Sequence, residues 1–323
     1  MKAVVFDGQL RLVNDCPEPT PAPGEARIRT ILVGICNTDL EVVRGYASFR
    51  GVPGHEFVGV VDWAEDRSWI GRRVVGEINV GCGACNVCRL GQPEHCPNRT
   101  ALGIRGRDGA LAEFFCLPVA NLHPVPVDLP DRAAVFVEPL AAACELLEQI
   151  HVRPTDRVVV VGDGRLGLIA AQVLALTGCD LSVVGRHAEK LAILGRRGID
   201  TRLTDEGLEG ADLVVECTGN PAGFGSAQRL VRPRGTLALK STYHGLANAD
   251  LSHLVVDEIQ VVGSRCGPFG AALRLLTHGL VDVTSLIHAE MRLDEALAAY
   301  ELAAQPGVLK VLVWASPDER NGA

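Results

Sequence analysis

Four cysteines crowded into one short segment constrain this chain more than any other feature of its sequence. They follow the spacing C-x2-C-x2-C-x7-C within GCGACNVCRLGQPEHCPN and are Cys82, Cys85, Cys88 and Cys96. Four thiolates on a tight, glycine-bearing loop can close a tetrahedral shell, which is typical of structural zinc. An iron–sulfur cluster, which also uses four thiolates, and four free or buried cysteines are the alternatives. We predict a structural zinc lobe at about residues 81–97.

The size and charge of the chain narrow the class of protein. Its 323 residues suggest about two domains, and 31 basic against 39 acidic side chains give a net charge of −8. That charge argues against a nucleic-acid binder. No apolar run approaches the roughly 20 residues that span a bilayer, and the N-terminus lacks the apolar core of a signal peptide. We expect a cytoplasmic protein with no nucleic-acid or membrane partner.

The hydrophobic pattern changes along the chain and indicates two domains. Residues 1 to about 125 contain short alternating runs typical of strands, and two of these, joined at Asp7 and Gly8, begin the chain. From Val158 onward, apolar strands, glycine turns and amphipathic helices alternate, which indicates a doubly wound parallel sheet covered by helices. The last segment has two helical stretches and a strand, VLKVLVW, and is expected to return to the first domain. The predicted fold class is α/β, with one domain of residues 1–137 and 267–323 and a second of 138–266.

A glycine-rich turn opens the second domain. VVVVGDGRLGLIAA contains a G-x-G-x-x-G pattern between an apolar strand and a helix. The first glycine permits the turn, the second lets a pyrophosphate approach the backbone, and the third packs helix against strand. We predict dinucleotide binding by Gly162, Gly164, Arg165, Leu166 and Gly167. A turn that binds nothing is the alternative.

Three further motifs mean little individually. They are GICNTD with Cys36, Thr38 and Asp39, PGHEFVG with His55 and Glu56, and FVEPLA with Glu138. Packing, a loop histidine and a helix-start carboxylate explain them separately. Their order along the chain, with the cysteine lobe and the glycine turn, resembles the zinc-dependent medium-chain alcohol dehydrogenase superfamily, in its polyol and threonine dehydrogenase-like branch. The resemblance covers essentially the whole chain and implies a GroES-like catalytic domain and a Rossmann domain.

The resemblance implies a catalytic zinc in a cleft between the domains. Cys36 and His55 would be ligands, and either Glu56 or Glu138 would be the third protein ligand. Thr38 matches the residue that takes the substrate proton, and Asp39 matches a carboxylate that orients a ligand, here His55. A catalytic zinc keeps an open position, acidifies an alcohol and polarises a carbonyl.

The cofactor prediction rests on the second strand of the nucleotide domain. Its LSVV run ends in Gly185, Arg186 and His187, followed by Lys190, and no carboxylate stands where NAD-binding proteins usually carry one. Glycine leaves room for a 2′-phosphate, and Arg and Lys can neutralise it. We predict NADP rather than NAD. The alternative is a solvated helix-start face with NAD held by adenine packing.

Three more residues complete the predicted cofactor site, and two other features stay open. Cys217, Thr218 and Gly219 end a strand on the side where dinucleotides bind. Lys310 is expected either to reach a cofactor phosphate or to cover the surface. The resemblance implies a homodimer or homotetramer.

The predicted function is hydride transfer between NAD(P) and an alcohol/carbonyl pair, with a secondary alcohol, polyol or amino alcohol as substrate. Two alternatives are a noncatalytic nucleotide-binding protein that keeps the fold, and a zinc-independent quinone or enoyl reductase. The presence of Cys36, Thr38, His55 and Glu138 together argues against both.

Overall fold

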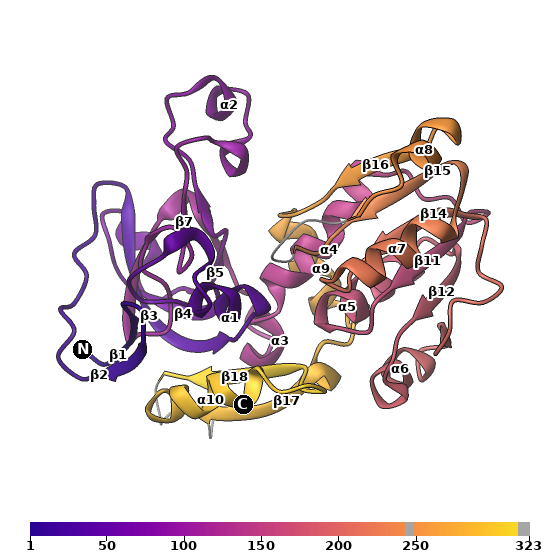
Figure 1. Cartoon of the computed structure of the whole chain (residues 1–323). Helices are drawn as coiled ribbons and strands as arrows, with labels where there is room; N and C mark the ends of the chain where they lie inside the picture. The colour runs from indigo at the N-terminus through magenta and orange to yellow at the C-terminus, as the bar shows by residue number, and fades with distance from the viewer. Residues whose placement is uncertain (243–247, 316–323) are drawn as a thin grey trace. The chain divides into compact units, whose positions relative to one another are not determined.

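The computed structural model describes residues 1–242 and 248–315, which divide into two compact units (Figure 1). We call Met1–Glu138 with the described residues from Ala272 onward the discontinuous unit, and Pro139–Ala271 the continuous unit. Among the described residues, no helix is both long enough and apolar enough to cross a membrane.

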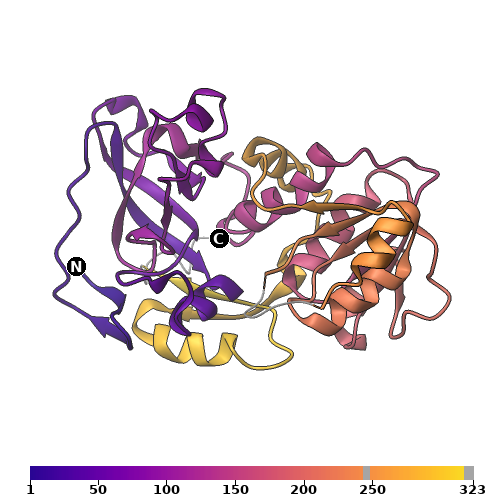
Figure 2. The ribbon, with the colours of Figure 1, turned by 45° about the horizontal axis from the view of Figure 1, so that its top comes forward.

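A seven-stranded sheet forms the centre of the discontinuous unit. Its strand order is β10-β5-β4-β3-β18-β17, with β9 paired to β3 beside this path. The strand bounds are β3 Glu25–Gly34, β4 Glu56–Ala64, β5 Arg73–Gly76, β9 Phe114–Pro118, β10 Leu122–Pro124, β17 Ile287–Arg292 and β18 Lys310–Trp314. The C-terminal strands lie beside N-terminal ones, yellow against indigo in Figures 1 and 2, because β18 pairs antiparallel with β3. The tail predicted to return to the first part of the chain therefore completes its sheet.

Alternation of apolar and polar residues explains this sheet. In β3, Ala26 and Ile28 are fully buried, whereas Arg27 between them stays half-buried. Phe57 and Phe115 meet edge to face in the core, with ring centroids 4.7 Å apart and planes at 73°. The β-rich character predicted for the first part of the chain is confirmed.

Smaller elements surround the sheet. The two strands expected around Asp7 and Gly8 form the antiparallel pair β1 and β2. A three-stranded sheet has the order β6-β7-β8, and the helix α2 lies between β6 and β7 along the chain. The bounds are β1 Ala3–Phe6, β2 Leu10–Val13, α1 Asn37–Val43, β6 Asn79–Val80, α2 Asn86–Arg89, β7 Thr100–Leu102, β8 Gly106–Arg107, α3 Asp131–Ala134 and α10 Ala296–Ala303.

The continuous unit is a Rossmann-type parallel sheet. Its order is β13-β12-β11-β14-β15-β16, and every adjacent pair is parallel. This is the doubly wound order that reverses at the first strand, and right-handed crossovers place helices on both faces. The bounds are β11 Arg157–Val161, α5 Arg165–Ala175, β12 Asp180–Val184, α6 Ala188–Gly195, β13 Asp200–Arg202, β14 Ala211–Glu216, α7 Pro221–Leu230, β15 Val231–Leu239, α8 Leu251–Val256 and β16 Gln260–Gly263, while α4 Val137–Gln149 and α9 Phe269–Thr277 contain the unit boundaries.

Two glycines of the predicted fingerprint are required by the backbone. Gly162 has a φ of +125°, and its N–H donates to the Val184 carbonyl at 2.8 Å, which ties the turn to β12. A Cβ at Gly167 would lie 2.1 Å from the Gly162 carbonyl oxygen, so any larger residue would push α5 away from β11. A Cβ at Gly164 would meet no atom within 4 Å, which leaves open space beside the start of α5.

Candidate functional site

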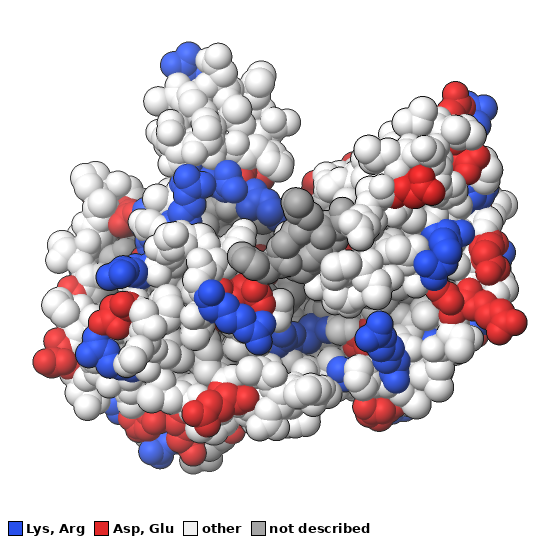
Figure 3. Space-filling model, viewed as in Figure 1, with Lys and Arg blue, Asp and Glu red and all other residues white. Residues whose placement is uncertain are grey.

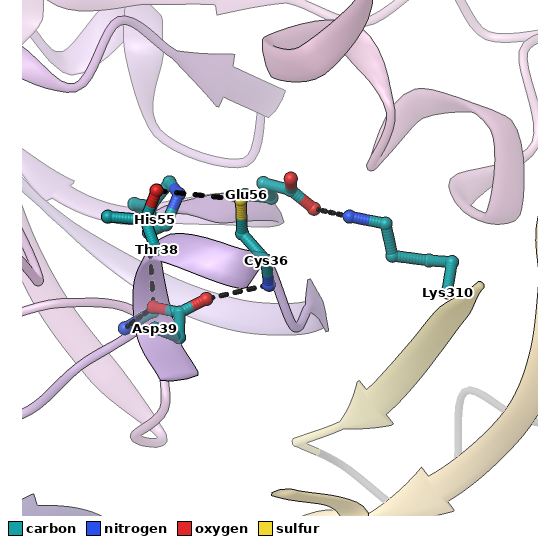
Figure 4. Close-up of polar contacts among 7 residues, drawn as sticks. Cys36, Thr38, Asp39, His55, Glu56 and Lys310 are labelled. Carbon is teal, nitrogen blue, oxygen red and sulfur yellow. Dashed lines mark hydrogen bonds and ion pairs between the residues drawn. The ribbon is translucent and has the colours of Figure 1, made fainter. Parts of the chain in front are cut away.

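Three of the predicted metal ligands converge in the discontinuous unit. Cys36 lies between β3 and α1, His55 precedes β4, and Glu56 begins that strand opposite Gly34 of β3. One donor atom from each lies within 4.8 Å of the other two (Figure 4). The β3–β4 pairing therefore brings together residues about 20 positions apart, which the sequence pattern alone could not position.

Asp39 fixes two of these residues. Its side chain is fully buried; Oδ2 accepts the Cys36 N–H at 2.8 Å and Oδ1 lies 3.1 Å from His55 Nδ1. Burial raises the pKa of this carboxyl, but the charge and hydrogen bond of His55 and the Cys36 N–H outweigh it and leave the pKa lowered. Asp39 thus holds the His55 ring through Nδ1 and the Cys36 backbone through its N–H.

Glu56 has one paired and one unpaired oxygen. Oε2 forms an ion pair with Lys310 Nζ, and both side chains are at most 2% exposed. Oε1 is buried and has no hydrogen-bond partner among the described residues. The Lys310 ammonium also lies 5.6 Å from the centre of the Phe136 ring. An unpaired buried carboxylate oxygen beside a thiol and an imidazole is the arrangement that a divalent metal satisfies.

The position of Lys310 differs from what the sequence suggested. Its residue is 1% exposed, in the interior of the discontinuous unit, and it contacts Glu56. The expectation that it covers the surface is wrong, because the neighbouring β18 residues are buried on both sides and carry the lysine inward with them. The interior carboxylate compensates the charge.

The other two predicted catalytic residues, Thr38 and Glu138, do not belong to the group of three converging donor atoms. Thr38 is half-buried in the first turn of α1, and the Cys36 thiol donates to its Oγ1 at 3.8 Å. Glu138, in the first turn of α4, is half-buried and has a polar partner of its own. The structure brings Glu56, rather than Glu138, to Cys36 and His55 among the described residues.

Replacing Asp39 by asparagine is expected to weaken zinc binding at the Cys36–His55–Glu56 cluster about 10- to 100-fold, because the carboxylate that orients His55 loses its charge. Competition with a chromophoric chelator measures this. Asp128→Asn, at an exposed position of the same unit, is the control and should leave zinc affinity unchanged. Equal zinc affinity of Asp39→Asn and the parent protein would contradict the assigned role.

The four lobe cysteines also converge. The Cys85 and Cys96 sulfurs are 3.7 Å apart, and a tetrahedral shell with zinc–sulfur bonds of about 2.3 Å requires about 3.8 Å. The Cys88 N–H donates to the Cys85 sulfur at 3.4 Å, and the N–H groups of Ala84 and Cys85 lower the pKa of Cys82 to about 6. Apart from a basic group at its tip, the lobe that carries α2 is mostly uncharged on the face shown in Figure 3. The sulfur spacing therefore fits a tetrahedral metal shell, whereas burial raises the pKa of the Cys88 thiol to about 12, so this cysteine would give up its proton on metal binding.

In the continuous unit, the predicted cofactor residues lie at the carboxyl ends of neighbouring parallel strands. Arg165 and Leu166 begin α5, and Arg186 and His187 follow β12. Lys190 lies in α6 and is 8% exposed, so it is less accessible than the sequence suggested. These positions match the edge of a doubly wound sheet where dinucleotides bind.

Cys217, Thr218 and Gly219 follow β14 at the same edge. Burial and the charge of Glu216 raise the pKa of Cys217 to about 12, so this residue stays a thiol. Glu216, which sequence reasoning missed, accepts the Thr218 N–H at 2.6 Å and also bonds the Ser241 hydroxyl. The Gly219 N–H donates to that hydroxyl at 2.9 Å. In the sequence, a charged residue at the end of an apolar strand is the signal that could have identified Glu216.

Two models of known protein families match this chain, one in its N-terminal part and one in its C-terminal part. Residues 22–127 match the model of the alcohol dehydrogenase GroES-like domain, and residues 166–278 match that of the zinc-binding dehydrogenases. An erythritol/L-threitol dehydrogenase from Mycolicibacterium smegmatis is 30% identical over 94% of each chain.

Two solved structures have the same fold. A zinc-binding dehydrogenase from Sinorhizobium meliloti 1021, bound to NADP, is 26% identical with a TM-score of 0.88 over 97% of this chain and 99% of that one. An alcohol dehydrogenase (rspB) from E. coli CFT073, complexed with NADH, is 26% identical with a TM-score of 0.89 over 98% and 99%. The predicted GroES-like and Rossmann folds are confirmed. With its two family domains, its relatives and its converging ligands, this chain belongs to the zinc-dependent medium-chain dehydrogenases of the alcohol dehydrogenase superfamily.

Proposed function

We propose that this protein interconverts a polyol, or a related secondary or amino alcohol, and its carbonyl product, with zinc held by Cys36, His55 and Glu56. Membership of the family makes the chain an NAD(P)-dependent oxidoreductase acting on CH–OH groups. The observation that carries the site proposal is the convergence of a thiol, an imidazole and a carboxylate with one unpaired oxygen within 4.8 Å. We propose a polyol as the substrate because one relative, 30% identical, is an erythritol/L-threitol dehydrogenase.

The residues present fit a catalytic zinc. Cysteine, histidine and glutamate are all zinc ligands, and three protein ligands leave a fourth position open to substrate. Bound zinc supplies a Lewis acid that makes an alcohol more acidic and polarises a carbonyl. In this proposal, Asp39 holds the His55 ring, and the half-buried Thr38 hydroxyl accepts the substrate proton.

We propose Glu56 as the resting carboxylate ligand and Glu138 as a second carboxylate of the reaction. Glu56→Ala is expected to lower zinc occupancy, because a carboxylate oxygen of Glu56 lies within 4.8 Å of the Cys36 and His55 donor atoms, whereas Glu138→Ala is expected to lower turnover while zinc stays bound. Zinc analysis and kcat, measured on both variants, separate these roles. Near-normal kcat in Glu138→Ala would show that Glu138 only stabilises the start of its helix. Full zinc occupancy in Glu56→Ala would exclude Glu56 as a ligand.

The cofactor site of this proposal lies in the continuous unit. It comprises the glycine turn at Gly162, Gly164 and Gly167, together with the residues that follow β12 and β14. NADP rather than NAD is the preference predicted from Gly185, Arg186 and Lys190. It stays a prediction, since one solved relative carries NADP and another NADH. Values of kcat/KM for both cofactors test it.

We further propose domains of residues 1–137 with 267–323 and of 138–266, a cytoplasmic location and a homodimer or homotetramer. Zinc-binding thiolates must stay reduced, which favours the cytoplasm. The exposed edge strand β16, with Val261, and the exposed Val255 and Val256 of α8 offer an apolar surface to a second copy. Light scattering at known concentration measures the oligomeric state.

The decisive test is optical measurement of cofactor reduction across alcohols, polyols and β-hydroxy amino acids, with the zinc-replete protein. Reduction with four-carbon or longer polyols, but not with simple primary alcohols, is the expected result. A protein that binds dinucleotide but reduces it with no substrate of the panel would favour the noncatalytic alternative. Carbonyl or enone reduction that survives zinc removal would favour the zinc-independent reductase.

A further inference from the structure

A glycine occupies the place where a dinucleotide-binding sheet usually carries its acidic residue. β12 ends at Val184, and Gly185 follows with its N–H donating to the Arg202 carbonyl at 3.0 Å. In most NAD-binding sheets of this kind, a carboxylate at the end of the second strand accepts the hydroxyls of the adenosine ribose. Its absence from the sequence here is the basis of the NADP prediction.

A carboxylate from another segment fills that place. Asp163 lies between the first two glycines of the turn that joins β11 to α5, and its side chain reaches across to the end of β12. A Cβ built on Gly185 would lie 2.5 Å from Asp163 Cβ and 2.6 Å from its Oδ2. A side chain at position 185 and the observed Asp163 conformation therefore exclude each other. The glycine leaves the room that the aspartate uses.

The residues after β12 hold this carboxylate firmly. Oδ2 accepts the N–H groups of Arg186 at 2.6 Å and of His187 at 2.7 Å, and lies 2.9 Å from His187 Nδ1. Burial by itself raises the pKa of the Asp163 carboxyl, but these donors outweigh it and leave the pKa lowered. Asp163 is thus ionised at neutral pH. All the hydrogen bonds that it accepts from the described residues end on Oδ2, so Oδ1 keeps its lone pairs for other donors.

We propose that Asp163 is the acidic, specificity-determining residue of this dinucleotide site, and that its carboxylate makes NAD(H) bind more tightly than NADP(H). Two successive backbone N–H groups form an anion-binding concavity, and here the protein's own carboxylate occupies it. A 2′-phosphate would lose those donors and meet a like charge, which is costly at short range. Ribose hydroxyls, in contrast, can donate to Oδ1.

The proposal rests on the proposed dinucleotide-dependent function and argues against the NADP preference predicted from the sequence. That prediction took Lys190 as an available point charge; Lys190 and Asp163 are both 8% exposed, but Asp163 is the charged group that contacts the backbone directly after β12. Arg186 keeps an exposed side chain, while its backbone N–H is committed to Asp163. The contacts of Asp163 with the backbone after Gly185 therefore favour NAD(H), the cofactor without a 2′-phosphate.

The test is fluorescence titration of the zinc-replete protein with NADH and NADPH in the absence of substrate. We expect the parent protein to bind NADH more tightly. Asp163→Asn keeps the shape and the acceptor but removes the charge. It should shift the ratio of Kd values at least about tenfold toward NADPH. Asp180→Asn is the control for net charge, because Asp180 is exposed at the start of β12, the end of that strand away from Gly185, and it should leave the ratio unchanged.

A double variant covers the case in which Asp163 also supports the fold of the turn. Asp163→Gly combined with Gly185→Asp moves the acid to the end of β12 and should restore the parent ratio that Asp163→Gly loses. An unchanged ratio in Asp163→Asn, or tighter NADPH binding by the parent protein, would overturn the proposal while the proposed enzyme function stands. Binding of neither dinucleotide by the parent protein would overturn the proposed function itself, and the inference with it.

Discussion

Replacing Cys36 by serine is expected to remove one of two zinc ions per chain and to lower kcat at least about a thousandfold, since the metal supplies several kcal/mol of transition-state stabilisation. The lobe ion should stay bound, because the four lobe cysteines and the Cys36–His55–Glu56 cluster share no residue. Zinc content by mass spectrometry and kcat measured on the same sample check both statements. The parent protein should contain about two zinc ions.

A matched control is available for Cys36→Ser in the same unit. Cys116 of β9 is a half-buried thiol whose pKa burial raises to about 11, and it belongs to neither cysteine-containing cluster. Cys116→Ser should therefore keep both zinc ions and most turnover. Loss of both ions from a folded Cys36→Ser protein would refute independent sites, and retention of both would refute Cys36 as a ligand.

Lys310→Met is expected to lower the free energy of unfolding by about 3–5 kcal/mol, because it leaves the buried Glu56 carboxylate without its cation. Denaturant unfolding of the parent and the variant, both freed of zinc, measures the loss, because zinc bound by Glu56 would itself compensate the carboxylate. The double variant Lys310→Met, Glu56→Gln should recover part of it, since the uncompensated charge is gone.

The same substitution at an exposed ion pair is the control. Lys2 pairs with Asp294 in the discontinuous unit, with side chains 31% and 43% exposed. Lys2→Met should cost about 1 kcal/mol or less, because solvent screens this pair. Equal losses for Lys310→Met and Lys2→Met would show that the interior pair contributes no more than an exposed one.

Local patterns predicted the features that depend on short stretches of chain. The lobe cysteines fall within fifteen residues, and the glycine turn joins a strand to the helix that follows it, so spacing alone identified both. The helices and strand of the C-terminal segment were likewise predicted from periodicity, as α9, α10 and β18.

Contacts between distant segments could not be predicted in the same way. Lys310 and Glu56 are 254 residues apart, and only the pairing of β18 with β3 brings them together. Asp163 and His187 meet across two adjacent strands, so a search for an acid after β12 overlooked the one before α5. A lysine inside an apolar strand and a glycine at the usual acidic position were the signals available.

The ion pair between β4 and β18 also bears on how the protein is made on the ribosome. At about 5–20 residues per second, Lys310 is synthesised roughly 13–50 s after Glu56, because 254 positions separate them. The continuous unit, residues 139–271, emerges within that interval and can fold as one piece. The sheet that carries Glu56 receives β18, its last strand along the chain, only after that unit has been made. Until then Glu56 lacks its buried cation, so the closing of this ion pair belongs to the end of synthesis.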